Sequence, residues 1–206
     1  MARALDVVGD RWALLVVREL LLGPRRYTDL VEGLPGVGTN VLSTRLRDLE
    51  AGGIIERTRV PAPTPAVLYQ LTDDGRDLRP VLDALAVWGT RRLTRPTSDQ
   101  AVEPRWFVLS LAAHLDPAEL DEGASFVLDV DGEAFTLAVT GDRVVASDGA
   151  DPHCTATVAG RLRDFFATAR GQTTASQRFT TTGDRAAATK LVKAMTGAIA
   201  HVTGKA

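Results

Sequence analysis

One segment of the sequence carries hydrogen-bonding side chains at the spacing of a helix face. Within residues 39–51, amide, hydroxyl and guanidinium groups recur every three or four residues, at Asn40, Ser43, Thr44 and Arg47. Side chains of this size and polarity reach base edges in a DNA groove, or phosphates. The other side of the same helix is apolar, with Leu42, Leu46 and Leu49. The segment therefore predicts a helix with a core face and a recognition face, although an ordinary surface helix shares this pattern.

Two further cationic side chains lie on the element that follows this helix. Gly52 and Gly53 predict the helix end, and the runs 54–60 and 66–71 are rich in β-branched and aromatic residues, which predicts a hairpin. Arg57 and Arg59 are two residues apart and so point to the same strand face. Prolines in the tip PAPTP stiffen the hairpin. Such a hairpin could act as a wing that contacts backbone phosphates beside a DNA groove. The alternative is an ordinary solvated hairpin whose charges serve solubility.

The residues before the recognition segment predict a helix-turn-helix. Residues 4–22 have helical periodicity with a break at Gly9 and Asp10, where Asp10 can cap a second segment. Arg25 and Arg26 precede a short helix DLVEGL, for which Thr28 is the expected N-cap. The turn PGVG then leads to Thr39, the expected N-cap of the recognition helix. A phosphate-cradling loop is not predicted at GLPGVGTN, because the Gly-Lys-Ser/Thr ending is missing.

Residues 72–93 predict a further helix with a broad apolar stripe. Pro80 either lies in its first turn or kinks it. The stripe includes a tryptophan at the edge of a small domain, and DNA-reading modules usually pair to match two half-sites. We therefore expect a homodimer whose interface uses Leu5, Leu82, Leu85 and Trp88. A purely intramolecular core is the alternative.

Composition indicates a cytoplasmic globular protein and excludes several classes of site. The chain has 206 residues, 45% of them hydrophobic, and no apolar run of the roughly 20 residues that span a bilayer, so no membrane partner is expected. The lone Cys154 forms no internal disulfide, and the three scattered histidines have no metal-ligand spacing. We expect no metal and no cofactor. Net charge does not by itself indicate nucleic-acid binding, because residues 1–95 hold 14 arginines against 12 acidic residues.

The first half of the sequence resembles a known family, the HxlR-type winged helix-turn-helix transcriptional regulators, which are relatives of MarR. The matching pieces are ALDVVGDRW with ELLLGPRRYTDL, LPGVGTNVLSTRLRDLEAGGIIER and YQLTDDGRDLRPVLDALAVWG. The resemblance implies a homodimer that binds double-stranded operator DNA through its third helix and its wing. By position it places four residues on the groove side and two on the wing, and it makes Arg25, Arg26 and Thr28 further phosphate contacts. The groove residues are Asn40, Ser43, Thr44 and Arg47, and the wing residues are Arg57 and Arg59.

The chain departs from the family at one point. Many members carry a cysteine just before the first helix, and in some members it senses oxidants or electrophiles. This chain starts at Met1 without one. Thiol sensing at that place is therefore not expected of the chain as it stands, although a start further upstream would change this.

The second half predicts an antiparallel sheet with helices. Residues 94–103 are polar and contain proline, and we take them as a linker between domains 1–93 and 104–206. A helix begins near Trp106, and strands are expected at 125–130, 133–140, 143–147 and 153–159. Asp131-Gly132 and Gly141-Asp142 are hairpin turns. A helix at 160–171, an extended run at 176–183 and a helix at 184–202 complete the chain. The predicted fold class is α+β.

The order of these elements resembles the sterol carrier protein family of the second type, over about residues 104–203. The most specific piece is the ending RFTTTGDRAAATKLVKAM. The resemblance implies a five-stranded, mainly antiparallel sheet with helices on one face and an apolar tunnel between them. Candidate lining residues are aromatic or large, although residues of these types at such spacing are more often simply core. They are Phe126, Phe135, Phe165, Phe166, Phe179 and Met195.

The leading hypothesis is a dimeric DNA-binding regulator that responds to a small hydrophobic effector bound by the second domain, or that uses this domain to support the dimer. The alternative is a carrier of lipids or other hydrophobic molecules whose winged domain only dimerises. An enzyme is a third reading, but His114, His153 and His201 fall in different predicted elements, and no motif groups a nucleophile with a base. We therefore expect no catalysis.

Overall fold

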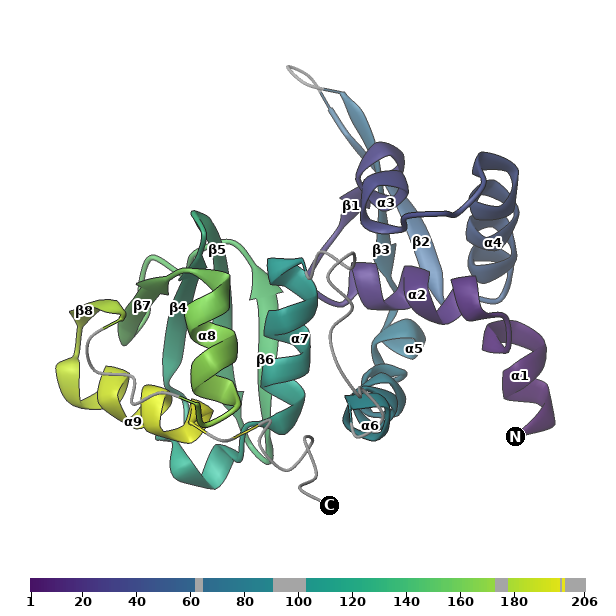
Figure 1. The fold of residues 1–206 in the computed structure, drawn as a ribbon. Helices are drawn as coiled ribbons and strands as arrows, with labels where there is room; N and C mark the ends of the chain where they lie inside the picture. Colours follow the sequence, from purple (N-terminus) through teal and green to yellow (C-terminus); the bar gives the residue numbers. More distant parts are fainter. Residues whose placement is uncertain (62–64, 91–102, 173–177, 197, 199–206) are drawn as a thin grey trace. The chain divides into compact units, whose positions relative to one another are not determined.

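The structure is a computed structural model that describes residues 1–61, 65–90, 103–172, 178–196 and 198 (Figure 1). It has two compact units, Met1–Leu82 and Asp83–Ala206. The first unit contains helices and a three-stranded sheet, and the second contains a five-stranded sheet with helices. The α+β fold class is therefore confirmed. The predicted linker lies almost entirely outside the described residues, and the two units divide within a helix, between residues 82 and 83.

The first unit begins with two helices, α1 (Ala2–Val8) and α2 (Arg11–Leu20). The predicted break lies between them, because the Asp10 carboxylate accepts a hydrogen bond of 2.8 Å from the backbone N–H of Trp12 and caps α2. Ala13, Val16, Val17 and Leu20 are buried on one side of α2. This side of the helix forms the centre of the unit's core.

The next two helices begin earlier than the sequence predicts. α3 spans Tyr27–Gly33 and α4 spans Thr39–Ala51, with Arg26 and Gly38 as their N-caps. Thr28 and Thr39 therefore lie inside their helices, and both predicted caps are wrong. Arg25–Arg26 forms strand β1, which pairs with a later strand and keeps the chain extended up to the first residue of α3. The Asp29 carboxylate satisfies the Arg26 N–H at 3.0 Å instead.

The end of α4 is a glycine stop, as predicted. Gly53 has a φ of 71°, in the left-handed region that favours glycine. The N–H of Ile54 donates to the Leu49 carbonyl at 2.9 Å, and the N–H of Gly53 donates to the Glu50 carbonyl at 3.1 Å. These two bonds close the last turn in a Schellman motif. They set the angle at which the chain leaves α4 for the wing.

The predicted hairpin is present as β2 (Ile55–Val60) and β3 (Ala66–Leu71). The two strands pair antiparallel from Ile55 with Leu71 to Val60 with Ala66. β3 also pairs with β1, which gives the sheet order β1-β3-β2. At the hairpin tip, residues 62–64 lie outside the described residues. The hairpin extends beyond α3 in Figure 1.

The predicted single helix at 72–93 is two helices, α5 (Asp73–Arg76) and α6 (Arg79–Thr90). Thr72 caps α5 through its hydroxyl, which accepts from the Gly75 N–H at 3.1 Å. Pro80 lies in the first turn of α6, one of the two placements expected, because a first-turn residue needs no intrahelical N–H partner. The remainder of the predicted helix, from residue 91, lies outside the described residues.

The second unit is built on a sheet of strand order β6-β5-β4-β7-β8. Its first three strands, β4 (Ser125–Val130), β5 (Glu133–Thr140) and β6 (Arg143–Asp148), form the expected meander. Positive φ angles at Asp131, Gly132 and Gly141 make the two tight turns. β7 (Ala156–Gly160) then pairs parallel with β4, and β8 (Thr180–Gly183) pairs antiparallel with β7. The sheet is therefore mixed but mainly antiparallel.

Helices cover one face of this sheet, as expected. α7 (Pro104–His114), α8 (Leu162–Ala169) and α9 (Arg185–Met195) all lie on the same side of the strands in Figure 1. A short 3-10 turn, η1 (Pro117–Glu119), follows α7 and is capped by Asp116. The part of the last predicted helix beyond residue 196 falls almost wholly outside the described residues. None of the described helices combines the length and the apolar character needed to cross a bilayer.

The loop before β7 is held by the carboxylate of Asp151. Ser125 Oγ donates to this carboxylate at 2.7 Å and the His153 N–H donates at 2.9 Å. The Asp151 N–H in turn donates to Thr136 Oγ1 at 3.0 Å. The serine hydroxyl, and secondly the His153 N–H, lower the pKa of Asp151 below its usual value. The loop is thus tied to β4 and β5.

This pKa shift predicts an acid-dependent loss of stability. A carboxyl whose folded pKa is lowered stabilises the fold above its unfolded pKa, and this contribution disappears as the pH falls through the folded pKa. We expect Ser125→Ala to lower the melting temperature at pH 7 and to differ less from the parent protein below about pH 4. Thermal unfolding of the two proteins across this range checks the prediction. A difference that does not depend on pH would contradict it.

Candidate nucleic-acid interface

The polar face of α4 is accessible, and its apolar face is buried. Leu42, Leu46 and Leu49 are at most 3% exposed. Asn40, Ser43 and Arg47 are exposed and Thr44 is half-buried, on the opposite side of the helix. The leucines pack with α2, α3 and the base of the wing in one core. This packing fixes the helix, so that its four hydrogen-bonding side chains form a rigidly supported polar face.

Arg45 and Arg47 have different environments, although both lie on α4. Arg45 forms ion pairs with Asp48 at 3.0 Å and with Asp10 at 3.5 Å. Arg47 is exposed and has no hydrogen bond or ion pair with any residue that the structure describes. The guanidinium of Arg47 is therefore available to an external acceptor, and that of Arg45 supports the contact between α2 and α4.

Tyr27 connects the beginning of α3 to the first turns of α4. Its hydroxyl donates to the carbonyl of Thr39 at 3.1 Å and lies 3.3 Å from Ser43 Oγ. The ring packs against the core of the unit. No local pattern in the sequence predicts this role of Tyr27, because Ser43 is 16 residues further along the chain.

Pairing in the wing sheet brings two predicted arginines into one row. Arg25 and Arg57 are the pairing partners of Tyr69 on its two sides, in β1 and β2. Directly paired residues point to the same face of a sheet. The sequence did not predict this row, because the two-residue strand Arg25–Arg26 has no periodicity to detect.

Arg57 is held by an acidic side chain from α4. Its Nε lies 2.7 Å from Glu50 Oε1, and the two side chains are 55% and 31% exposed. The hydrogen bond and charge of Glu50 raise the pKa of Arg57. Glu50 therefore ties the wing to the last turn of α4 and orients the arginine. No local pattern predicts this role of Glu50, because Arg57 lies seven residues further along, in another element.

Of the other predicted phosphate contacts, Arg59 lies on the same sheet face as this row, as predicted, whereas Arg26 and Thr28 are not part of it. Arg26 pairs with Leu68 and so points to the other face of the sheet. Thr28 is exposed in the first turn of α3, where its hydroxyl donates to Asp29 at 3.2 Å. Arg59 is exposed opposite Val67, farther along the wing, and has no hydrogen bond or ion pair with described residues.

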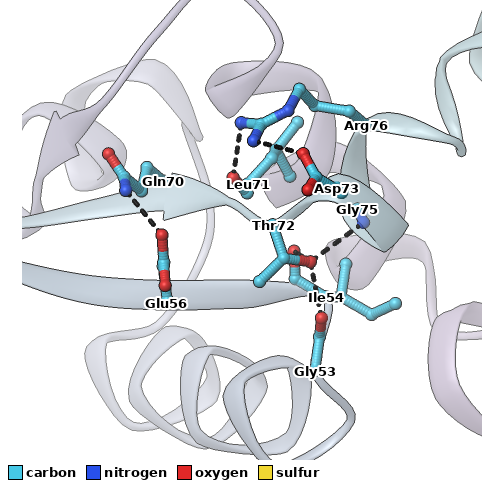
Figure 2. A network of polar contacts seen from close by, with 9 residues as sticks. All are labelled: Gly53, Ile54, Glu56, Gln70, Leu71, Thr72, Asp73, Gly75 and Arg76. Atoms are coloured by element: carbon cyan, nitrogen blue, oxygen red, sulfur yellow. Dashed lines mark hydrogen bonds and ion pairs between the residues drawn. The ribbon is translucent and has the colours of Figure 1, made fainter.

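A polar network connects the base of the wing to the end of α4 (Figure 2). The hydroxyl of Thr72 donates to the Gly53 carbonyl at 2.6 Å and accepts from the Gly75 N–H. Arg76 donates to the Leu71 carbonyl at 2.7 Å and to Asp73 at 2.8 Å. Across the two strands, Gln70 donates to Glu56 at 2.6 Å. The bond from Thr72 to Gly53 joins the base of the wing to the residues that follow α4, whereas the Gln70 bond lies within the wing and the Arg76 bonds join the wing to α5.

The residues predicted for dimerisation are largely exposed. Leu5 on α1 is 57% exposed, and Leu85 and Trp88 on α6 are 46% and 55% exposed. Leu82 is half-buried and packs against the core of the first unit. Val81 is also exposed, so that α6 presents an apolar stripe at positions 81, 85 and 88.

The predicted lining residues of the second unit lie mainly in its core. Phe126, Phe135, Phe165 and Met195 are at most 1% exposed, whereas Phe166 and Phe179 are half-buried. Ring contacts involve Phe165, Phe166 and Phe179: the centroids of Phe165 and Phe179 are 4.5 Å apart, and that of Phe166 lies 4.7 Å from that of Phe107. No grouping of three or more potential metal ligands occurs in the described part of the chain. Cys154 Sγ lies 3.6 Å from Thr157 Oγ1.

Comparison with known proteins gives one consistent result for the first half. The family model described as HxlR-like helix-turn-helix matches residues 7–97. An HTH-type transcriptional regulator from Synechocystis is 45% identical over 85 residues, which are 41% of this chain and 63% of that protein. The HTH-type regulator YvaP from Bacillus subtilis is 36% identical over 43% of this chain and 82% of its own length. YodB from the same organism is 32% identical, over 50% of this chain and 85% of its own length.

Proposed function

Because this chain belongs to the HxlR-like helix-turn-helix family of DNA-binding transcriptional regulators, we propose that its α4 enters the major groove of operator DNA and that its wing follows the backbone. In this arrangement Asn40, Ser43, Thr44 and Arg47 face the bases. Arg57 and Arg59 contact phosphates from the wing, and Arg25, Arg26 and Thr28 do so from the region before α4. The observation that carries the proposal is the exposed polar face of α4 above its buried leucines.

The test is binding of the full chain to duplex DNA. Sites selected from a pool of randomised duplexes will define the operator, and fluorescence anisotropy will measure affinity as a function of salt. A dimer that reads two half-sites will select inverted repeats. A chain that carries hydrophobic molecules and uses its winged unit only to dimerise will show no salt-sensitive retention on duplex DNA.

Arg59 provides a sharp prediction for the wing. Because its exposed guanidinium has no partner among the described residues, Arg59→Ala removes one cation from the phosphate contacts without breaking the fold. We expect weaker binding to all sequences alike, and a salt dependence of log affinity that is shallower by about one. If Arg59→Ala changed base preference while the salt dependence stayed the same, the backbone role of the wing would be wrong.

We propose that two copies pair through α1 and the exposed stripe of α6. The supporting observation is that Leu5, Val81, Leu85 and Trp88 are large, apolar and between 46% and 57% exposed. Large exposed apolar side chains of this kind mark interaction sites. Sedimentation should give the mass of two chains, and a single-chain mass at concentrations that bind DNA would contradict the proposal.

We also propose that the second unit receives a small hydrophobic effector between its sheet and its helices. Support comes from the apolar interior there, which contains Phe126, Phe135, Phe165 and Met195, with Phe166 and Phe179 at its border. Such a ligand alters DNA binding only if it prefers one dimer geometry over another. Native mass spectrometry of the purified chain should detect a bound hydrophobic molecule whose removal changes operator affinity. An affinity unaffected by its removal would leave the unit as a dimer support.

A further inference from the structure

The contact between Tyr27 and α4 bears on the direction of the hydroxyl proton of Ser43. The Tyr27 hydroxyl is 3.1 Å from the Thr39 carbonyl and 3.3 Å from Ser43 Oγ. A phenol has a single proton, and a carbonyl oxygen can only accept. Because that proton is donated to Thr39, the hydrogen bond between Tyr27 and Ser43 requires the serine to be the donor. The proton of Ser43 is thus directed inward, to the phenolic oxygen.

We propose that Tyr27 makes Ser43 a hydrogen-bond acceptor at the outer surface of α4, so that the recognition helix prefers an amino group at the base edge it meets there. In the major groove, adenine presents such a donor at N6 and cytosine at N4. Guanine and thymine present only acceptors at the corresponding places. This inference rests on the proposed function, because it specifies what one residue of the recognition face reads.

The surroundings of Ser43 favour this orientation. A helical serine commonly donates to the carbonyl four residues earlier, which for Ser43 is that of Thr39. Tyr27 already donates to that carbonyl. The Tyr27 ring packs against the core, so its hydroxyl is held in place with little further loss of side-chain freedom. Ser43 itself is exposed, so its oxygen, which has two lone pairs, remains accessible to a donor outside the protein.

Tyr27 is therefore a positioning residue, because it acts through the Ser43 hydroxyl. Its removal should change the base preference at one operator position. The experiment first selects operator sites with the full chain from randomised duplexes. Ser43→Ala then identifies the position whose preference depends on Ser43. Four duplexes that differ only at that base pair are titrated with the parent chain, Ser43→Ala and Tyr27→Phe, and the affinities are measured by fluorescence anisotropy.

We expect the parent chain to bind the duplexes with adenine or cytosine at the base that Ser43 contacts about fivefold more tightly than those with guanine or thymine at that base. This is the effect expected of one hydrogen bond. Ser43→Ala should bind the four duplexes within about twofold of one another. Tyr27→Phe should lose most of the preference, because the serine can then turn its proton toward a guanine or thymine acceptor. Tyr69→Phe removes the other phenol of the chain, which lies beside Arg57 in the wing sheet; any change in affinity that it causes should be the same for all four duplexes, so that the parent preference is retained.

The outcomes separate this inference from the proposed function. If the parent chain selects no sequence at all, the proposed function itself fails. If the parent selects an operator but Tyr27→Phe keeps the parent preference, or if Ser43→Ala alters no position, the inference about Tyr27 is overturned while DNA binding stands. A preference for guanine or thymine at the Ser43 position also overturns it. Melting temperatures of the variants show whether a loss of preference accompanies a loss of folding.

Discussion

Arg47→Ala is expected to weaken operator binding by about 1–3 kcal/mol, or roughly 5- to 150-fold, with the loss concentrated at one base position. The reason is that Arg47 lies on the exposed face of α4 with its guanidinium unpaired among the described residues. An arginine in this situation can donate two hydrogen bonds to the O6 and N7 of a guanine. Titration of the selected operator and of its single-base variants measures both the size and the position of the effect.

Arg45→Ala is the matched control, since it removes the same kind of side chain two residues away on the same helix. Arg45 is paired with Asp48 and Asp10, and its side chain is 32% exposed. Loss of these pairs should lower stability by at most about 1 kcal/mol and leave base preference unchanged. Equal operator affinity of Arg47→Ala and the parent protein would show that the recognition face of α4 is misplaced.

The second large effect is expected from Gly75→Ala, which should destabilise the first unit by about 2–3 kcal/mol. A Cβ at this position would overlap the carbonyl oxygen of Ile54 and would lie 3.2 Å from Leu71 Cδ2. The Ile54 carbonyl cannot move away freely, because it accepts from the Thr72 N–H at 3.0 Å. Relief of the overlap therefore disrupts the network that holds the wing to α4 (Figure 2).

Thermal and chemical unfolding of the full chain measure this change. The transition of the first unit should shift down by roughly 10–20 °C, and operator affinity should fall because the wing loses its anchor. Gly89→Ala is the control in a neighbouring helix: among the described residues, no atom outside its own helix backbone and chain neighbours lies within 4 Å of the added Cβ, and alanine is the better helix former. We expect it to leave stability unchanged or raise it by up to about 1 kcal/mol. Parent-like stability of Gly75→Ala would refute the close packing of α5 on the α4–β2 connection.

The sequence by itself determined the elements whose patterns are local. Leu42, Leu46 and Leu49 define a buried helix face through their spacing alone, because each repeats within one or two turns. The Asp131-Gly132 turn is equally local, since two adjacent residues must both adopt positive φ. The two threonine caps were wrong because capping depends on the residue at which the chain leaves its extended path. For α3 the pairing of β1 with β3 places this point at Arg26, and for α4 it lies at Gly38, at the end of the turn.

Only the tertiary structure decided how the candidate DNA-binding residues are held. The row of Arg25, Tyr69 and Arg57 exists because strands distant in sequence pair side by side. The Glu50 partner of Arg57 and the Tyr27 partner of Ser43 likewise come from other elements, seven and 16 residues away. A hydrophobic repeat records which side of a helix is buried, but it does not record which neighbouring element supplies the group that a polar side chain meets. That depends on how the helices and strands pack, and here this packing determines which arginines are paired and which phenol meets Ser43.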